Sequence, residues 1–264
     1  MDLGLKGKIA VVTGSTAGIG FAIANTLAAE GARVIVNGRT QARVDSAMEK
    51  IRKETSKADV RGVAADLGSA DGVKAFTKVI SEADILINNL GIFEPKPFAE
   101  IPDADWLRFF EVNVLSGVRL SRHYLPAMLR KNWGRIIFIS SESGQQIPAE
   151  MIHYGITKTA QIAVARGLAE TVAGTGITAN SVLVGPTASE GVGTFVADLA
   201  KQQGISSAEF EKKFFAGVRP SSLLKRFETP EEVAAVVAFI ASTQSATISG
   251  AAVRADGGVV RSIL

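Results

Sequence analysis

The sequence contains no cysteine, and it has only two histidines, His123 and His153. The absence of thiols excludes disulfide bonds, zinc–thiolate sites and cysteine nucleophiles. Two histidines leave almost nothing from which a histidine-rich metal site could be built. Thiol catalysis is therefore excluded, and we expect no metal cofactor.

Long apolar runs and clusters of one charge are also absent. No window approaches the roughly 18 to 20 uninterrupted apolar residues of a membrane span, and residues 1–14 lack the apolar centre of a signal peptide. The net charge is +3, and the basic residues are scattered along the chain. We therefore expect a cytoplasmic protein that binds neither nucleic acid nor membranes.

The composition that remains is that of a folded α/β protein. The chain has 264 residues, of which 47% are hydrophobic, and this is ample for a buried core. Charged residues make up 21%, which disfavours long disordered stretches. No repeat, linker or shift of composition marks a boundary, so we expect one domain over residues 1–264.

Short β-branched runs alternate with longer amphipathic stretches along the chain. This alternation predicts a mostly parallel sheet with helices on both faces. The expected strands lie within 8–14, 32–39, 58–67, 83–91, 134–141, 176–185 and 250–258. The expected helices lie within 19–31, 41–55, 71–82, 106–131 and 153–173.

Residues 186–227 interrupt the alternation and carry four phenylalanines, Phe195, Phe210, Phe214 and Phe215. We expect two helices here, over one end of the sheet. A surface insertion is one interpretation. The length and aromatic content favour a substrate-binding lid.

A glycine-rich turn, "TGSTAGIG" at 13–20, joins the first expected strand to the first expected helix. Gly14 permits a tight turn, Gly18 lets the backbone approach a pyrophosphate, and Gly20 allows the helix to pack closely on the strand. The phosphates would bind at the start of the helix, where the backbone N–H groups and the helix dipole favour negative charge. In this position, between a strand and a helix, the turn predicts a dinucleotide site.

The end of the second expected strand indicates which dinucleotide binds. NAD-binding folds usually place an acidic residue there, whereas this strand ends "VIVNGRT" with Arg39. A guanidinium can hold a 2′-phosphate with two hydrogen bonds, so we expect NADP(H) in preference to NAD(H), although Arg39 could also be a solvated surface residue. Asp66 is expected to meet the adenine ring, with a helix N-cap as its alternative role.

Tyr154 and Lys158 are four residues apart in an expected helix, so both side chains project from one face. A nearby ammonium would stabilise the phenolate and lower the tyrosine pKa, which would suit Tyr154 to proton transfer with a carbonyl oxygen. Such a pair alone is more often a surface pair. The glycine turn upstream favours a catalytic role.

With "TGSTAGIG", "NNLG" and "YGITK" in this order, the chain resembles the short-chain dehydrogenase/reductase family over nearly its whole length, and within it the 3-oxoacyl carrier-protein reductases. The resemblance implies a Rossmann-type, doubly wound sheet of seven parallel strands and a nicotinamide cofactor. It also implies a homotetramer or a homodimer, which the apolar chain end "DGGVVRSIL" favours.

The resemblance also assigns roles to individual residues. As catalytic residues it implies Asn113, which would hold a water that links Lys158 to bulk solvent, and Ser141, Tyr154 and Lys158. As cofactor-binding residues it implies Gly14, Ser15, Thr16, Gly18, Ile19, Gly20, Arg39, Asp66, Leu67, Asn88, Gly91, Tyr154, Lys158, Gly185 and Thr187. Near the substrate we single out Glu142, Gln146 and Met151.

Three positions depart from the family pattern. Leu90 replaces the alanine of "NNAG", Val184 stands where a proline usually precedes Gly185, and Ala17 stands where many NADP-preferring relatives carry a basic residue. Arg39 would therefore have to select the cofactor alone. His153, next to Tyr154, is expected to begin a helix and not to act as a second acid or base. Glu142 could contact the substrate, point to solvent or pair across a subunit contact.

Together these observations predict an NADP(H)-dependent oxidoreductase that interconverts a carbonyl and a secondary alcohol, with a small-molecule substrate. An NAD-dependent sugar or polyol dehydrogenase is one alternative. A regulatory protein that binds a dinucleotide without turnover is another, although such a protein has no need of Ser141, Tyr154 and Lys158 together.

Overall fold

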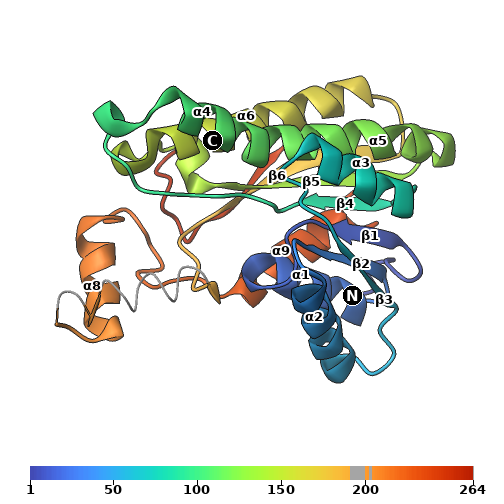
Figure 1. Ribbon diagram of the computed structural model, residues 1–264, viewed down its shortest axis with the longest axis horizontal. Helices are drawn as coiled ribbons and strands as arrows, with labels where there is room; N and C mark the ends of the chain where they lie inside the picture. Colours follow the sequence, from blue (N-terminus) through green and yellow to red (C-terminus); the bar gives the residue numbers. More distant parts are fainter. Residues whose placement is uncertain (191–199, 202–203, 264) are drawn as a thin grey trace.

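The computed structural model describes residues 1–190, 200–201 and 204–263. Seven strands form one sheet in the order β3-β2-β1-β4-β5-β6-β7, and every neighbouring pair is parallel (Figure 1). The strands are β1 (Ile9–Val12), β2 (Arg33–Gly38), β3 (Val60–Ala64), β4 (Ile85–Asn88), β5 (Gly134–Ser141), β6 (Ile177–Val184) and β7 (Ala252–Ala255). The predicted doubly wound, seven-stranded parallel sheet is confirmed.

Helices cover both faces of the sheet (Figure 1). The α-helices with described bounds are α1 (Gly18–Ala29), α2 (Gln41–Glu54), α3 (Ala70–Val79), α4 (Asp103–Phe110), α5 (Ser116–Lys131), α6 (Ile152–Thr171), α8 (Ser207–Gly217) and α9 (Pro230–Ala241). Helices α1, α2 and α9 pack on one face, and α3, α5 and α6 pack on the other. None of the helices described is long and apolar enough to cross a membrane.

The two hydrophobic cores follow from the alternation of side chains along each strand. Val12 and Ile139 pack under α1 and α9, whereas their neighbours Val11 and Phe138 pack under α5. A strand that is buried on both faces needs apolar residues at successive positions. This requirement explains the continuous apolar runs that predicted the strands.

The long helix predicted over 106–131 is divided in the structure. Helix α4 runs into a π-helical turn, η2 (Glu111–Leu115), before α5 begins. Both parts repeat the apolar period of a helix, so the sequence pattern does not reveal the extra residue in the π turn.

Within 186–227, α8 lies at one end of the molecule (Figure 1), and Ala200 and Lys201 are also helical. Ser206 begins α8 through a capping box, because its hydroxyl accepts a hydrogen bond from Glu209 N (3.2 Å) and the Glu209 carboxylate accepts one from Ser206 N (2.9 Å). Phe195 lies outside the described residues, as does part of the segment predicted to form the second helix.

Candidate active site

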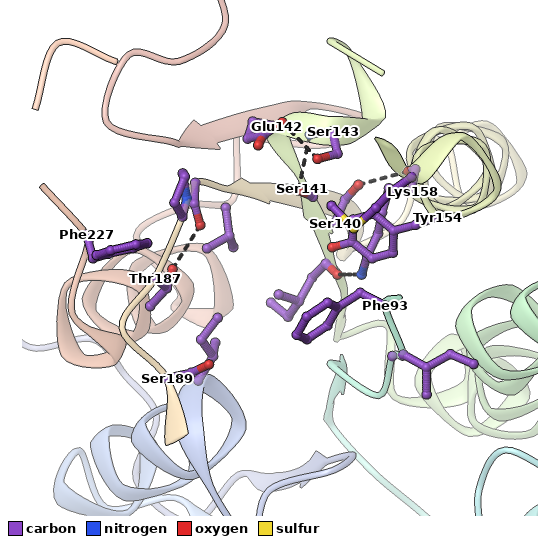
Figure 2. Close-up of a pocket in the computed structure, with 18 of the residues that line it drawn as sticks. Phe93, Ser140, Ser141, Glu142, Ser143, Tyr154, Lys158, Thr187, Ser189 and Phe227 are labelled. Atoms are coloured by element: carbon purple, nitrogen blue, oxygen red, sulfur yellow. Dashed lines mark hydrogen bonds between the residues drawn. The ribbon is translucent and has the colours of Figure 1, made fainter. Parts of the chain in front are cut away.

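The sheet changes winding direction between β1 and β4, and the carboxyl ends of the central strands border a cavity of ≈ 280 Å³ there (Figure 2). Open α/β sheets usually bind their ligands at this switch point. The cavity is lined by polar residues and by a group of aromatic residues. They include Asn89, Ser141, Glu142, Ser143, Tyr154, Lys158, Thr187, Phe93, Phe210, Phe214 and Phe227.

The glycine turn has the backbone geometry that the sequence predicts. Gly14 and Gly18 have φ values of +60° and +55°, which favour glycine. Asn37, at the end of β2, fixes the turn by accepting a hydrogen bond from Gly14 N (3.2 Å). The buried Ser15 hydroxyl donates to Val12 O (2.6 Å) and accepts from Asn37 N (3.0 Å), so this side chain holds the turn together.

The start of α1 fits a dinucleotide pyrophosphate. Ala17 is the N-cap and makes no side-chain hydrogen bond, so no N-cap side chain competes for the N–H groups of the first turn. A small cavity opens there, lined by residues that include Ala17, Gly18 and Asn89. A Cβ at Gly20 would lie 2.4 Å from Gly14 O, so only glycine lets the helix start this close to the turn. The donor groups and the space both suit a phosphate ligand.

The residues predicted to select and hold the adenosine half lie in different environments. Arg39 is exposed directly after β2, and a second guanidinium, Arg43, lies in the first turn of α2 and pairs with Glu190 (3.4 Å). Asp66 is exposed and accepts a hydrogen bond from Gly68 N (3.1 Å), whereas the side chain of Leu67 is buried in the core. The N-cap of α3 is Ser69, so the alternative role suggested for Asp66 is wrong.

Asn88 and Asn89 face different surroundings after β4. The Asn88 side chain is buried against α5, where it donates to Ser121 Oγ (3.4 Å). Asn89 lines the cavity and donates to Thr13 O (2.9 Å) and Gly14 O (3.1 Å), so it is Asn89 that joins β4 to the glycine turn. Asn89 was not among the residues predicted from the sequence, although the alternation of faces along the strand separates it from Asn88.

Ser141 and Tyr154 meet at the cavity (Figure 2). Ser141 ends β5, and Tyr154 lies in the first turn of α6. Burial raises the pKa of Tyr154 to about 12, and Glu142 acts in the same direction, while a hydrogen bond with Ser141 and the charge of Arg219 oppose it. The phenol is therefore protonated at neutral pH and can donate a proton. The lowering of its pKa that we expected from Lys158 is not found in this structure.

Lys158 is buried one helical turn after Tyr154, with its Nζ 5.5 Å from the centre of the tyrosine ring. The ammonium donates to Ile139 O (2.9 Å) and to Gln161 Oε1 (3.2 Å). Burial lowers the pKa of Lys158 to about 8. The ammonium can therefore lose its proton at a pH close to the physiological range.

Asn113 lies in the π-helical turn beside Lys158. Its side chain accepts from Ile92 N (2.8 Å) and donates to Ile92 O (3.0 Å) and Thr157 Oγ1 (2.9 Å). These bonds hold the loop after β4 against α6. A Cβ at Gly91 would lie 3.5 Å from both Asn113 Oδ1 and Lys158 Nζ, so Gly91 is a close neighbour of both groups.

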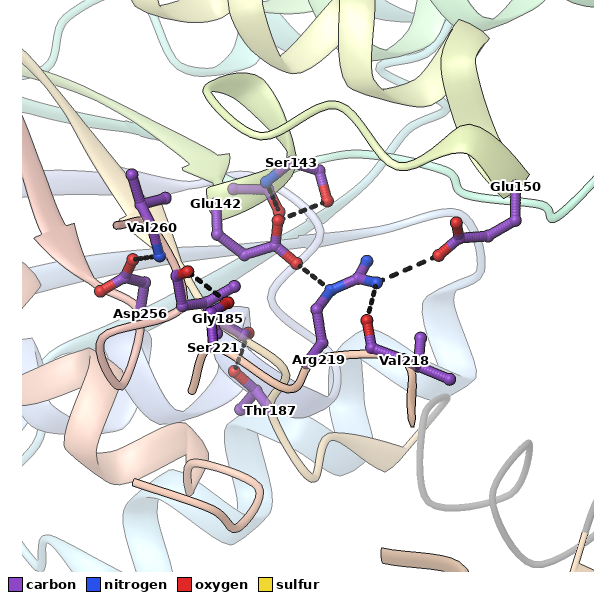
Figure 3. Close-up of polar contacts among 12 residues, drawn as sticks. Glu142, Ser143, Glu150, Gly185, Thr187, Val218, Arg219, Ser221, Asp256 and Val260 are labelled. Atoms are coloured by element: carbon purple, nitrogen blue, oxygen red, sulfur yellow. Dashed lines mark hydrogen bonds and ion pairs between the residues drawn. The ribbon is translucent and has the colours of Figure 1, made fainter. Parts of the chain in front are cut away.

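Glu142, directly after Ser141, is buried and forms an ion pair with Arg219 (Figure 3). Arg219 Nε donates to Glu142 Oε1 (2.8 Å), and Ser143 Oγ donates to Glu142 Oε2 (2.9 Å). Arg219 also reaches Glu150 (3.1 Å). Glu142 therefore neither points to solvent nor needs another subunit for its partner, and those two alternatives are wrong.

The remaining residues singled out near the substrate lie in different environments. Met151 lines the cavity, whereas Gln146 is exposed. His153 begins α6 with a fully buried ring against Phe109 and Trp106. Burial lowers its pKa, which agrees with a structural role for this neutral ring.

Sequence and structure comparisons identify relatives of the chain. Residues 8–200 match the family model for short chain dehydrogenases. The uncharacterised oxidoreductase YvaG of Bacillus subtilis is 47% identical, over 100% of both chains. The 3-oxoacyl-[acyl-carrier-protein] reductase FabG of Aquifex aeolicus is 32% identical, over 98% of this chain and 100% of the relative.

A crystal structure of L-sorbose reductase from Gluconobacter frateurii, complexed with NADPH and L-sorbose, superposes with a TM-score of 0.94. It is 30% identical, and the match covers 100% of both chains. The chain therefore belongs to the short-chain dehydrogenase/reductase family, and it is an oxidoreductase that acts on an alcohol/carbonyl pair with a nicotinamide dinucleotide.

Proposed function

We propose that the protein is an NADPH-dependent reductase of a small ketone, with Tyr154 as the general acid. The observation that carries this proposal is the convergence of Ser141, Tyr154 and Lys158 on one cavity beside the glycine turn. The same site can run in reverse and oxidise a secondary alcohol.

The roles of the side chains follow from their protonation and position. A nicotinamide dinucleotide held at the glycine turn and the start of α1 would supply the hydride for the carbonyl carbon. Tyr154, protonated at neutral pH, donates its proton to the carbonyl oxygen as charge develops there. Ser141 holds the same oxygen by a hydrogen bond, which fixes the carbonyl for both transfers. The ammonium of Lys158 stabilises the phenolate that Tyr154 becomes.

NADPH is proposed in preference to NADH because β2 ends without an acidic residue and is followed by the exposed Arg39. A carboxylate at this position would repel a 2′-phosphate, whereas a guanidinium attracts it. The similar L-sorbose reductase was crystallised with NADPH, which supports the same choice.

A polyhydroxylated ketone, such as a ketose, is the proposed substrate class. Glu142 and Ser143 line the cavity and offer hydrogen bonds to hydroxyl groups, and Phe93, Phe214 and Phe227 offer apolar contact to the carbon chain. The whole-length similarity to L-sorbose reductase supports this class. We further propose that 186–227 acts as the lid over this cavity within a single domain.

We also propose a homotetramer or a homodimer in the cytoplasm. Large apolar side chains are exposed at Phe98, Leu107 and Leu223, and a subunit contact would cover such groups. Size-exclusion chromatography with light scattering tests the assembly, since a monomer at micromolar concentration would contradict it. Cell fractionation tests the location.

The cofactor proposal is tested by titrating the protein with NADPH and NADH while following nicotinamide fluorescence. NADPH should bind at least about tenfold more tightly, a difference of about 1.4 kcal/mol. Arg39→Ala should remove most of this preference with little effect on NADH. Equal binding of both cofactors by the native protein would contradict the proposal. A screen of ketoses, polyols and simple ketones with the preferred cofactor then tests the substrate class.

A further inference from the structure

The side-chain amide of Gln161 joins Lys158 to the backbone of Asn113 in the π turn. No other side chain among the described residues bonds to both. Gln161 Nε2 donates to the backbone carbonyl of Asn113 (2.6 Å), and Gln161 Oε1 accepts from Lys158 Nζ (3.2 Å). The side chain is 1% exposed. It therefore bridges the ammonium of Lys158 directly to the backbone of Asn113.

The orientation of this amide is determined by its neighbours. A carbonyl oxygen can only accept a hydrogen bond, and an ammonium can only donate one. The Gln161 nitrogen must therefore face Asn113 and its oxygen must face Lys158. The amide can therefore adopt only one orientation, in which its partially negative oxygen faces the lysine.

Lys158 lines the cavity, whereas Gln161 and Asn113 are not among its lining residues. Two of the three ammonium hydrogens are used by Ile139 O and Gln161 Oε1, which leaves one for a ligand or for Tyr154. Gln161 follows Tyr154 and Lys158 at the seven-residue and three-residue spacings of a helix face, so α6 itself sets the three side chains in line. The π turn supplies the carbonyl of Asn113 as the other anchor.

We propose that Gln161 is a positioning residue, which fixes Lys158 against the π turn so that the ammonium stays charged and points at Tyr154. This inference rests on the proposed function, since it assigns Lys158 its role there. An unanchored lysine side chain of this length would lose both its direction and an acceptor for its charge. Gln161 acts through Lys158 and need not touch the substrate.

Two near-isosteric variants test this role, because they change the interaction in opposite senses. Gln161→Met removes the amide, so the buried ammonium loses an acceptor and its pKa should fall. Gln161→Glu places a negative charge beside Nζ, so the pKa should rise, by about one unit or more. Tyr154 and Glu142 are the ionisable residues that line the same cavity, and neither is changed. Gln244→Met, at an exposed position, is the matched control.

The titration of Lys158 is followed by NMR of the protein labelled at lysine ¹³Cε, and its signal is assigned by its loss in Lys158→Arg. The native signal should titrate near pH 8, with shifts of opposite sign in the two variants and none in the control. The alkaline limb of the pH–kcat profile should move in the same directions. Variants that shift neither the titration nor the profile, or shift both in one direction, would overturn the inference. If Gln161→Met does not fold, the sign of the shift in Gln161→Glu decides alone.

The NMR titration requires no turnover, so the two proposals can fail separately. A native protein that reduces no ketone, but whose Lys158 titration still moves in opposite directions, would refute the proposed function and leave the positioning of Lys158 intact. Turnover that is normal in Gln161→Met over the whole pH range would refute the positioning role and leave the proposed function intact.

Discussion

Arg219 donates a 2.8 Å hydrogen bond from Nε to Oε1 of Glu142, although the two residues are 77 positions apart in the chain. Glu142 follows Ser141 at the end of β5, and Arg219 follows α8. Both side chains are buried. The pair therefore attaches the end of the α8 segment to the centre of the candidate active site.

Replacing one partner of this ion pair should lower the free energy of unfolding much more than replacing both. Arg219→Met leaves the Glu142 carboxylate buried without its cation, and the free energy of unfolding should fall by about 3–5 kcal/mol. Urea denaturation of Arg219→Met, Glu142→Gln and the double variant measures this effect, and the double variant should recover most of the loss. Simple additivity of the two single effects would contradict a direct interaction.

Arg226 and Glu232 provide the matched control for this experiment. They form an ion pair of similar length, 2.6 Å, but their side chains are 45% and 47% exposed. Exposed pairs contribute little, because water screens them. Arg226→Met should therefore change the free energy of unfolding by no more than about 1 kcal/mol.

Burial of Lys158 should make the native protein less stable than a variant without this charge. The pKa of Lys158 in the folded protein is about 8, below its ordinary value of 10.5. The unfolded chain therefore holds more protons between these values, and the native protein should gain stability as the pH rises from about 8 to 10.5. Below about pH 8, Lys158→Met should be more stable than the native protein by up to about 3 kcal/mol, with its activity lost.

Urea denaturation of both proteins at pH 7 and at pH 10.5 measures this difference. The advantage of Lys158→Met should be present at pH 7 and nearly absent at pH 10.5. A variant that is less stable than the native protein at both pH values would show that the hydrogen bonds of Lys158 outweigh the cost of burying its charge.

Two glycine-to-alanine variants should differ in their effects: one should weaken dinucleotide binding, and the other should raise stability. A Cβ at Gly20 would lie 2.4 Å from both Gly14 O and Asn89 Nδ2, so Gly20→Ala should displace the turn and weaken dinucleotide binding. Gly167 lies within α6 with nothing within 4 Å of its added Cβ, so Gly167→Ala should stabilise the protein by about 0.5–1 kcal/mol. Thermal unfolding and NADPH titration of both variants check this, and a Gly20→Ala protein with native affinity would contradict the role of the turn.

The extent to which the fold and site could be predicted depended on whether the relevant signal was local. The order of strand, glycine turn and helix lies within a short stretch, so the sheet and the turn could be predicted. The role of Arg219 could not be predicted, because its partner Glu142 is distant in sequence. Nothing in the polar pattern around Arg219 links the two residues. Gln161 could have been found, since it shares a predicted helix face with Tyr154 and Lys158.

The environment of each ionisable group was harder to predict than its position. Tyr154 and Lys158 lie at one cavity, as their spacing indicated. The pKa of Tyr154 is nevertheless raised, because burial outweighs the charges around it. Spacing along a helix specifies which side chains are neighbours. It does not specify how much water the rest of the chain excludes from them.

The proposed role of Tyr154 as the general acid is tested by comparing the native protein and Tyr154→Phe in a single turnover, with NADPH and a reducible ketose. Phenylalanine keeps the ring and removes only the proton donor. Hydride transfer should slow by about 10²–10⁴-fold in Tyr154→Phe, while the affinity for NADPH should be unchanged. Hydride transfer at the native rate in Tyr154→Phe would show that Tyr154 is not the acid.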